Sequence, residues 1–83
     1  MSPALVSAPL SAEQARAESI GYQALAYVGK RLPLQVFCSA AGHYIGTADA
    51  DGPVSRESVS YFRSQQAADR ALKTGRWQQR LDP

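Results

Sequence analysis

Residues 34–48 read LQVFCSAAGHYIGTA, and this stretch decides the fold. It is rich in β-branched and aromatic residues, which favour strands, and it is interrupted near its middle by AAG at 40–42. A three-residue interruption that ends in glycine is typical of a β-hairpin loop. The stretch therefore predicts a hairpin with strands at 34–39 and 43–48.

The predicted loop sets the register of this hairpin. A three-residue loop at 40–42 pairs Phe37 with Ile45 and Cys38 with Tyr44. Because side chains alternate between the two faces of a strand, Phe37 and Ile45 then share a face, and Cys38 and His43 lie on opposite faces. Both faces of the hairpin carry apolar groups, so a domain with two layers leaves Phe37 and Ile45 partly uncovered.

A helix is predicted before the hairpin, over residues 12–28. This range contains no proline, and apolar residues recur at every fourth position from Ile20 to Val28. Ser11 is a favoured N-cap residue, and Gly29 is a favoured residue just after a helix end.

Further elements are predicted after the hairpin. Residues 49–53, which read DADGP, indicate a loop, and the alternating residues 58–62 predict a third strand, antiparallel to the second. A second helix is predicted over 65–74, between a serine N-cap and a glycine. Residues 76–80 are predicted to be extended or to form a short edge strand, with Trp77 folded back onto the core.

These elements predict a small α+β domain in the order α-β-β-β-α. We expect a three- or four-stranded antiparallel sheet with two helices packed on one face, because an antiparallel sheet needs a cover on its apolar side. The prolines and serines of residues 1–10 indicate a flexible N-terminal lead, and residues 11–83 form the single domain.

Composition limits the classes of function. Of the 83 residues, 45% are hydrophobic and 19% are charged, with a net charge of +2, which is typical of a globular domain. No apolar run reaches the roughly 20 residues of a membrane span, so we expect no membrane partner. One cysteine and one histidine exclude an internal disulfide bond and a Cys/His zinc site within one chain. We therefore expect no metal and no cofactor, and the absence of a secretory signal pattern favours a cytoplasmic protein.

Short motifs mark the C-terminal half of the chain: GHYIGT at 42–47, GPVSRES at 52–58, YF at 61–62 and GRWQQR at 75–80. This pattern resembles a group of small uncharacterised bacterial proteins that are often seen among the accessory genes of plasmids and integrated mobile elements. The resemblance implies a bacterial accessory protein, and it implies no catalytic residue.

Three hypotheses of function follow, and the leading one is a small non-catalytic interaction module. It would bind a protein partner or self-associate through the uncovered sheet face at Phe37 and Ile45. The second is a nucleic-acid-binding protein, because basic residues alternate with Tyr61, Phe62 and Trp77 in the C-terminal part. Its candidate binding residues are Arg63, Arg70, Lys73, Arg76 and Arg80.

The third hypothesis is an enzyme that depends on Cys38 and His43, which flank the hairpin loop. A thiolate nucleophile needs a base within hydrogen-bond reach, and the predicted register sends these two side chains to opposite faces. The sequence also lacks phosphate-binding, dinucleotide-binding and hydrolase motifs. We therefore expect that the protein is not an enzyme.

Overall fold

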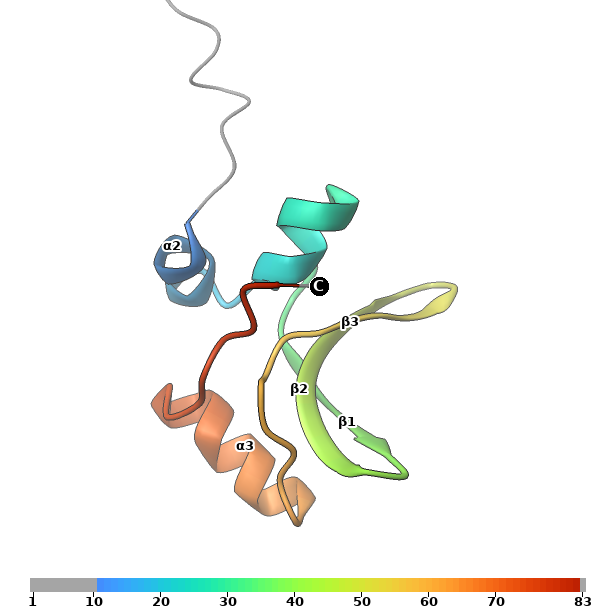
Figure 1. Ribbon diagram of the computed structural model, residues 1–83, viewed down its shortest axis with the longest axis vertical. Helices are drawn as coiled ribbons and strands as arrows, with labels where there is room; N and C mark the ends of the chain where they lie inside the picture. Colours follow the sequence, from blue (N-terminus) through green and yellow to red (C-terminus); the bar gives the residue numbers. More distant parts are fainter. Residues whose placement is uncertain (1–10, 83) are drawn as a thin grey trace, which may run out of the picture.

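The computed structural model describes residues 11–82 (Figure 1). In chain order the elements are α2 (Ala12–Ala17), η1 (Ala24–Val28), β1 (Gln35–Ser39), β2 (Gly42–Asp49), β3 (Gly52–Arg56) and α3 (Gln65–Thr74). The strands form an antiparallel sheet in the order β1-β2-β3. The predicted α+β class and the α-β-β-β-α order are confirmed, whereas the predicted flexible lead at 1–10 lies outside the described residues.

The N-terminal helix is broken, so the prediction of one helix over 12–28 is wrong. α2 ends at Ala17, and Ser19 has a left-handed backbone with a φ of 57°. The N–H of Gly21 donates to the Leu32 carbonyl (2.9 Å), which lies outside both helical segments. Glycine inside a helix costs about 1 kcal/mol of stability relative to alanine. Gly21 avoids this cost because it lies at the break between the two helical segments.

The helix ends follow the capping residues of the sequence. Ser11 and Gln14 form a reciprocal capping box, in which each backbone N–H donates to the other side chain (2.9 and 3.1 Å). The Ser64 hydroxyl accepts from the Ala67 N–H (3.1 Å), and Gly75, with a φ of 75°, ends α3. The second helix therefore has its predicted bounds.

A two-residue turn joins β1 to β2, so the predicted three-residue loop is wrong. Ser39 lies opposite Gly42, which leaves only Ala40 and Ala41 between the strands. The Ser39 hydroxyl stabilises this turn, because it accepts from the Ala41 N–H (3.3 Å) and donates to the Gly42 carbonyl (3.1 Å). The register is shifted by one residue from the prediction, which changes the cross-strand partner of every side chain in the hairpin.

The third strand, β3, comes earlier in the chain than predicted. The predicted strand at 58–62 contributes only isolated bridges, one of them between Phe62 and His43. The Asp49 carboxyl group accepts from the Asp51 N–H (2.9 Å), which favours a tight turn, and β3 starts directly after it. The loop predicted from the Asp, Gly and Pro residues is therefore only a short hairpin turn.

α3 packs against β1 and β2, and the core lies between this helix and the sheet (Figure 1). The core consists of Ile45, Ala71 and Trp77, with Leu34, Phe62 and Leu72 packed against them. Trp77 is 9% exposed, so its predicted position on the core is confirmed. The Arg16 guanidinium lies 4.1 Å from the centre of the indole and donates to the Gly75 and Trp77 carbonyls, which ties α2 to the C-terminal segment.

An ion pair links the end of the η1 region to the β2–β3 turn. The Lys30 ammonium group donates to Asp49 (2.5 Å), and this bond, followed by the Asp51 N–H, holds the pKa of Asp49 below its ordinary value. A carboxyl group whose pKa is lowered by folding stabilises the fold above its unfolded pKa, about 3.9. That contribution is lost as the pH falls through the lower pKa of the folded state.

We predict that Lys30→Met raises the pKa of Asp49 toward the unfolded value, because the largest cause of its depression is removed. A carboxyl-carbon NMR titration of wild type and variant measures this shift. Arg31→Met is the matched control, since Arg31 pairs with Glu18 instead. An unchanged pKa of Asp49 in Lys30→Met would show that Lys30 does not lower this pKa.

Candidate functional site

The face of the sheet opposite α3 carries a cluster of aromatic side chains. Ile45 points into the core below α3, so its neighbour Tyr44 and the cross-strand partner Phe37 point away from the helix. Arg56 lies opposite Gly46 and therefore on the same face as Tyr44. We call this cluster the outer face, and it consists of Phe37, Tyr44, Arg56 and Tyr61.

The side chains of the outer face contact one another in a continuous row. The ring centres of Phe37 and Tyr44 are 5.6 Å apart, and those of Tyr44 and Tyr61 are 6.0 Å apart in an edge-to-face arrangement. The Arg56 guanidinium lies 4.7 Å from the centre of the Tyr61 ring, within cation–π range. Tyr61 is 42% exposed, and Phe37 and Tyr44 are half-buried. Such rings offer both apolar area and hydroxyl groups for hydrogen bonds to a partner.

The Tyr44 ring covers Gly46. A Cβ at Gly46 would lie 2.9 Å from Cε2 of Tyr44 and closer still to the Ser55 carbonyl oxygen. Only glycine leaves room for the ring at this position, so the lack of a side chain at Gly46 is part of how the row of rings is built.

The structure divides the predicted interaction pair, Phe37 and Ile45, between the two faces of the sheet. Ile45 is fully buried and pairs with Val36, whereas Phe37 pairs with Tyr44 on the outer face. The prediction that they share an uncovered face is wrong because of the one-residue register shift. The sequence reasoning did not place Tyr44, Arg56 or Tyr61 on the same face as Phe37, although the same alternation with a two-residue turn puts Tyr44 beside Phe37.

The five candidate basic residues do not all remain free. The Arg80 guanidinium donates to the Arg56 carbonyl (2.9 Å), which ties it to β3. The other four are exposed, and their side chains form no hydrogen bond or ion pair with any residue from 11 to 82: Arg63, Arg70, Lys73 and Arg76. Phe62 and Trp77 lie in or against the core, so Tyr61 is the exposed member of the three aromatic residues predicted to alternate with these cations.

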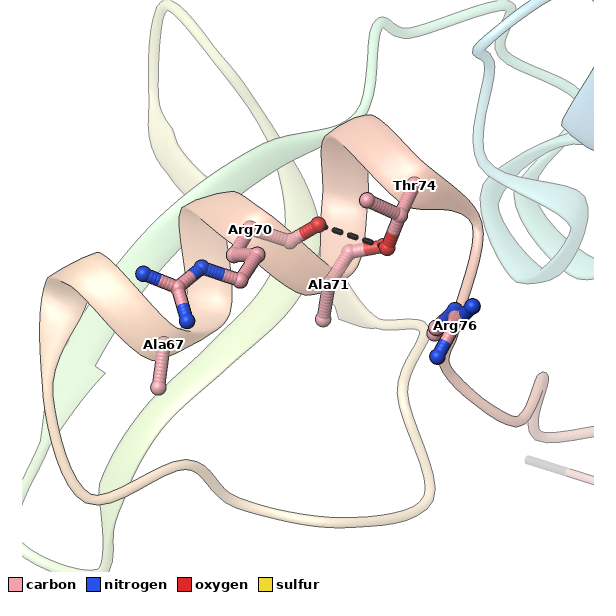
Figure 2. A pocket seen from close by; sticks show the side chains of 5 residues that line it. All are labelled: Ala67, Arg70, Ala71, Thr74 and Arg76. Atoms are coloured by element: carbon pink, nitrogen blue, oxygen red, sulfur yellow. Dashed lines mark hydrogen bonds between the residues drawn. The ribbon is translucent and has the colours of Figure 1, made fainter.

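Two of these free cations line a pocket on α3. Its volume is about 510 Å³, and its walls are formed by Ala67, Arg70, Ala71, Thr74 and Arg76. Figure 2 shows the methyl groups of Ala67 and Ala71 on one side of the helix, with Arg70 near one end of this surface and Arg76 beyond the last turn at the other. The Thr74 hydroxyl donates to the Arg70 carbonyl (2.8 Å), so its proton is not available to donate a hydrogen bond to a ligand.

Cys38 and His43 lie directly opposite each other across the hairpin, so the prediction that they occupy opposite faces is wrong. The two-residue turn is the cause. The Cys38 thiol is exposed and contacts the Ser39 carbonyl at 3.9 Å, and Nδ1 of His43 is buried without a hydrogen-bond partner among the described residues. No hydrogen bond joins the thiol to the imidazole in this part of the chain, and a general base needs such contact with its nucleophile.

Glu57 is fully buried, and the sequence did not predict this burial. Its Oε1 accepts from the Gln23 N–H (2.8 Å) and from Nε2 of Gln79 (2.8 Å). Its Oε2 accepts from the Ala24 N–H (3.1 Å) and from the Ser55 hydroxyl (2.5 Å). A buried carboxyl group that receives the free N–H groups at a helix start acts as a cap, so Glu57 holds the fold and offers no exposed surface for a ligand.

The acidic and metal-ligating residues are dispersed. Within residues 11–82 no group of three or more His, Cys, Asp or Glu side chains is arranged to hold a metal ion. Asp49 is engaged by Lys30, and Glu57 by the donors that surround it. The outer face and the α3 pocket are the candidate sites that we consider further.

Comparison of the chain with protein-family models, with curated proteins and with solved structures finds no match. Among residues 11–82, no helix combines the length and the apolar character needed to cross a membrane.

Proposed function

We propose that the chain is a small non-catalytic binding module that self-associates through its outer face. The observation that carries this proposal is the row of three aromatic rings, Phe37, Tyr44 and Tyr61, on the side of the sheet that α3 leaves uncovered. Tyrosine residues are enriched among the side chains that contribute most to protein–protein binding. Burial of these rings against a partner would remove apolar area from water.

A second copy of the chain is the partner that we propose. β1 is the outermost strand on its side of the sheet, and its residues QVFCS carry no charge. Edge strands that must avoid pairing usually carry charged residues or proline, so this edge does not oppose the approach of another sheet. A domain of this size also buries a modest share of its surface when it folds alone, and association adds to that burial.

We predict that the wild-type chain forms dimers or larger species in sedimentation equilibrium between about 10 μM and 1 mM, and that Phe37→Thr weakens them at least about tenfold, or about 1.4 kcal/mol. Threonine keeps the preference for a strand but removes the ring. Val28→Thr is the matched control, because Val28 is 51% exposed but lies on η1. A mass of 8.9 kDa at every concentration, or equal weakening by both variants, contradicts the proposal.

The second candidate function is the binding of nucleic acid through the exposed basic residues. It is favoured by the lack of any partner, among residues 11–82, for Arg63, Arg70, Lys73 and Arg76. Free guanidinium and ammonium groups neutralise backbone phosphates and release their counterions. The net charge of +2 is small for such a protein, and Phe62 and Trp77 are not free to stack on bases. For these reasons self-association remains the first proposal.

The cellular setting that we propose is the bacterial cytoplasm, as an accessory protein of a mobile element. This part of the proposal is supported by the resemblance of the motifs at 42–47, 52–58 and 75–80 and by the unpaired Cys38. It requires no metal and no cofactor.

A further inference from the structure

The α3 pocket differs from the outer face in both position and chemistry. It lies on the helix, its floor is formed by Ala67 and Ala71, and its charged groups are Arg70 and Arg76 (Figure 2). Its volume of about 510 Å³ falls within the range of about 300–1,000 Å³ that is usual for small-molecule sites. The pocket therefore has room for a ligand larger than a single ion.

Both arginines are available to a ligand. Neither guanidinium group makes a hydrogen bond or an ion pair with any of the described residues, and both side chains are exposed. Asp69 is the acidic residue of α3, and it forms no ion pair with Arg70 or Arg76. The charge of the two guanidinium groups is thus not neutralised by the fold.

The chemistry of the pocket favours a phosphate group. A guanidinium group donates two parallel hydrogen bonds to a phosphate or carboxylate, and a phosphate monoester carries a charge of about −1.5 to −2 at neutral pH. The pocket has a guanidinium group at each end, so one of them can donate to a phosphate monoester while the other adds positive charge, and the higher charge of the monoester favours it over a single carboxylate. The short side chains of Ala67 and Ala71 leave the space between Arg70 and Arg76 open. Lys73, which lies one turn from Arg70 on α3, adds a further positive charge nearby.

We propose that the α3 pocket binds a phosphate monoester, with Arg70 and Arg76, at the two ends of the pocket, as the side chains that supply its positive charge. A small phosphorylated molecule is the ligand class, and the remaining space beside Ala67 and Ala71 takes part of its organic group. This inference does not depend on the outer face.

Titration of the full chain with adenosine 5′-monophosphate, inorganic phosphate and adenosine, followed by amide NMR shifts, tests the proposal. We expect saturable shifts in α3 with the first two ligands, at dissociation constants below about 10 mM, and none with adenosine. Arg70→Gln and Arg76→Gln should each weaken binding at least about fivefold, since each removes one of the two positive charges that line the pocket. Both sites are exposed, so the substitutions should leave the circular dichroism spectrum unchanged.

Arg63→Gln is the matched control, because Arg63 is exposed and basic but does not line the pocket. It should leave the affinity for the monophosphate unchanged. Absence of saturable shifts, or equal weakening by Arg63→Gln, overturns the proposal. An oligothymidine without terminal phosphates provides a further arm. If it binds more tightly than the monophosphate and is weakened by all three substitutions, the ligand is a nucleic-acid backbone on a broad basic surface and the pocket assignment is wrong.

Discussion

Glu57→Gln should lower the free energy of unfolding by about 2–4 kcal/mol, a large share of the roughly 4–12 kcal/mol expected for 83 residues. The carboxyl group accepts four hydrogen bonds in a fully buried position, two of them from the backbone N–H groups of Gln23 and Ala24. A glutamine of the same shape turns one acceptor into a donor. At least one backbone N–H, that of Gln23 or that of Ala24, then faces an NH₂ group and loses its acceptor without access to water.

Urea unfolding followed by the fluorescence of the buried Trp77 measures this loss. Glu13→Gln is the matched control, because Glu13 is exposed on α2 and should change stability by no more than about 0.5 kcal/mol. A Glu57→Gln variant as stable as Glu13→Gln would mean that Glu57 does not cap the segment at Gln23 and Ala24.

Gly21→Ala should destabilise the fold by at least about 2 kcal/mol, because the added methyl group has no space. Its Cβ would lie 2.5 Å from Oε2 of Glu57 and closer still to the methyl group of Thr47, and both neighbours are fully buried. The sign of this effect separates two structures of the N-terminal region. In the unbroken helix over 12–28 that the sequence predicts, the same substitution would stabilise by up to about 1 kcal/mol.

A double-mutant cycle with Thr47→Ser identifies the cause of this destabilisation. Serine removes the methyl group but keeps the hydroxyl that lies 2.6 Å from the Ser55 hydroxyl. Gly21→Ala should therefore cost less in the Thr47→Ser background than in wild type, with a coupling of at least about 0.5 kcal/mol. Additive effects would show that the two residues do not touch.

Local signals predicted the elements whose ends depend on nearby residues. α3 has its predicted bounds because Ser64 and Gly75, a cap and a left-handed terminator, act within a few residues of the helix. Local signals did not predict the break in the N-terminal helix. The break at Ser19 and Gly21 depends on Leu32 and Glu57, which are distant in sequence, so the periodicity of residues 12–28 could not reveal it.

The register of the hairpin depends on hydrogen bonds of the Ser39 side chain that composition does not show. Gly42 fits the end of a three-residue loop, but the Ser39 hydroxyl stabilises a turn of two residues. The shorter turn also buries Ile45 under α3 and leaves Phe37 beside Tyr44. Phe37 could thus be predicted as a surface residue from the sequence, whereas its neighbours on the outer face could not.

The basic residues illustrate a second limit of sequence reasoning. Charge alone predicted that these residues are exposed. Charge does not show that Arg80 donates to the Arg56 carbonyl, or that Arg70 and Arg76 line one pocket. Both features depend on the path of the C-terminal segment along the fold. A charge count does not distinguish a cation bound to a carbonyl from one left free for a ligand.

We propose that the chain contacts a second copy of itself through the outer face. Amide NMR spectra recorded over a range of protein concentrations test it most directly. We expect that the resonances that move with concentration belong to residues 35–39, 44, 56 and 61, and that those of α3 stay in place. Movement confined to α3, or no movement at any concentration, would contradict it.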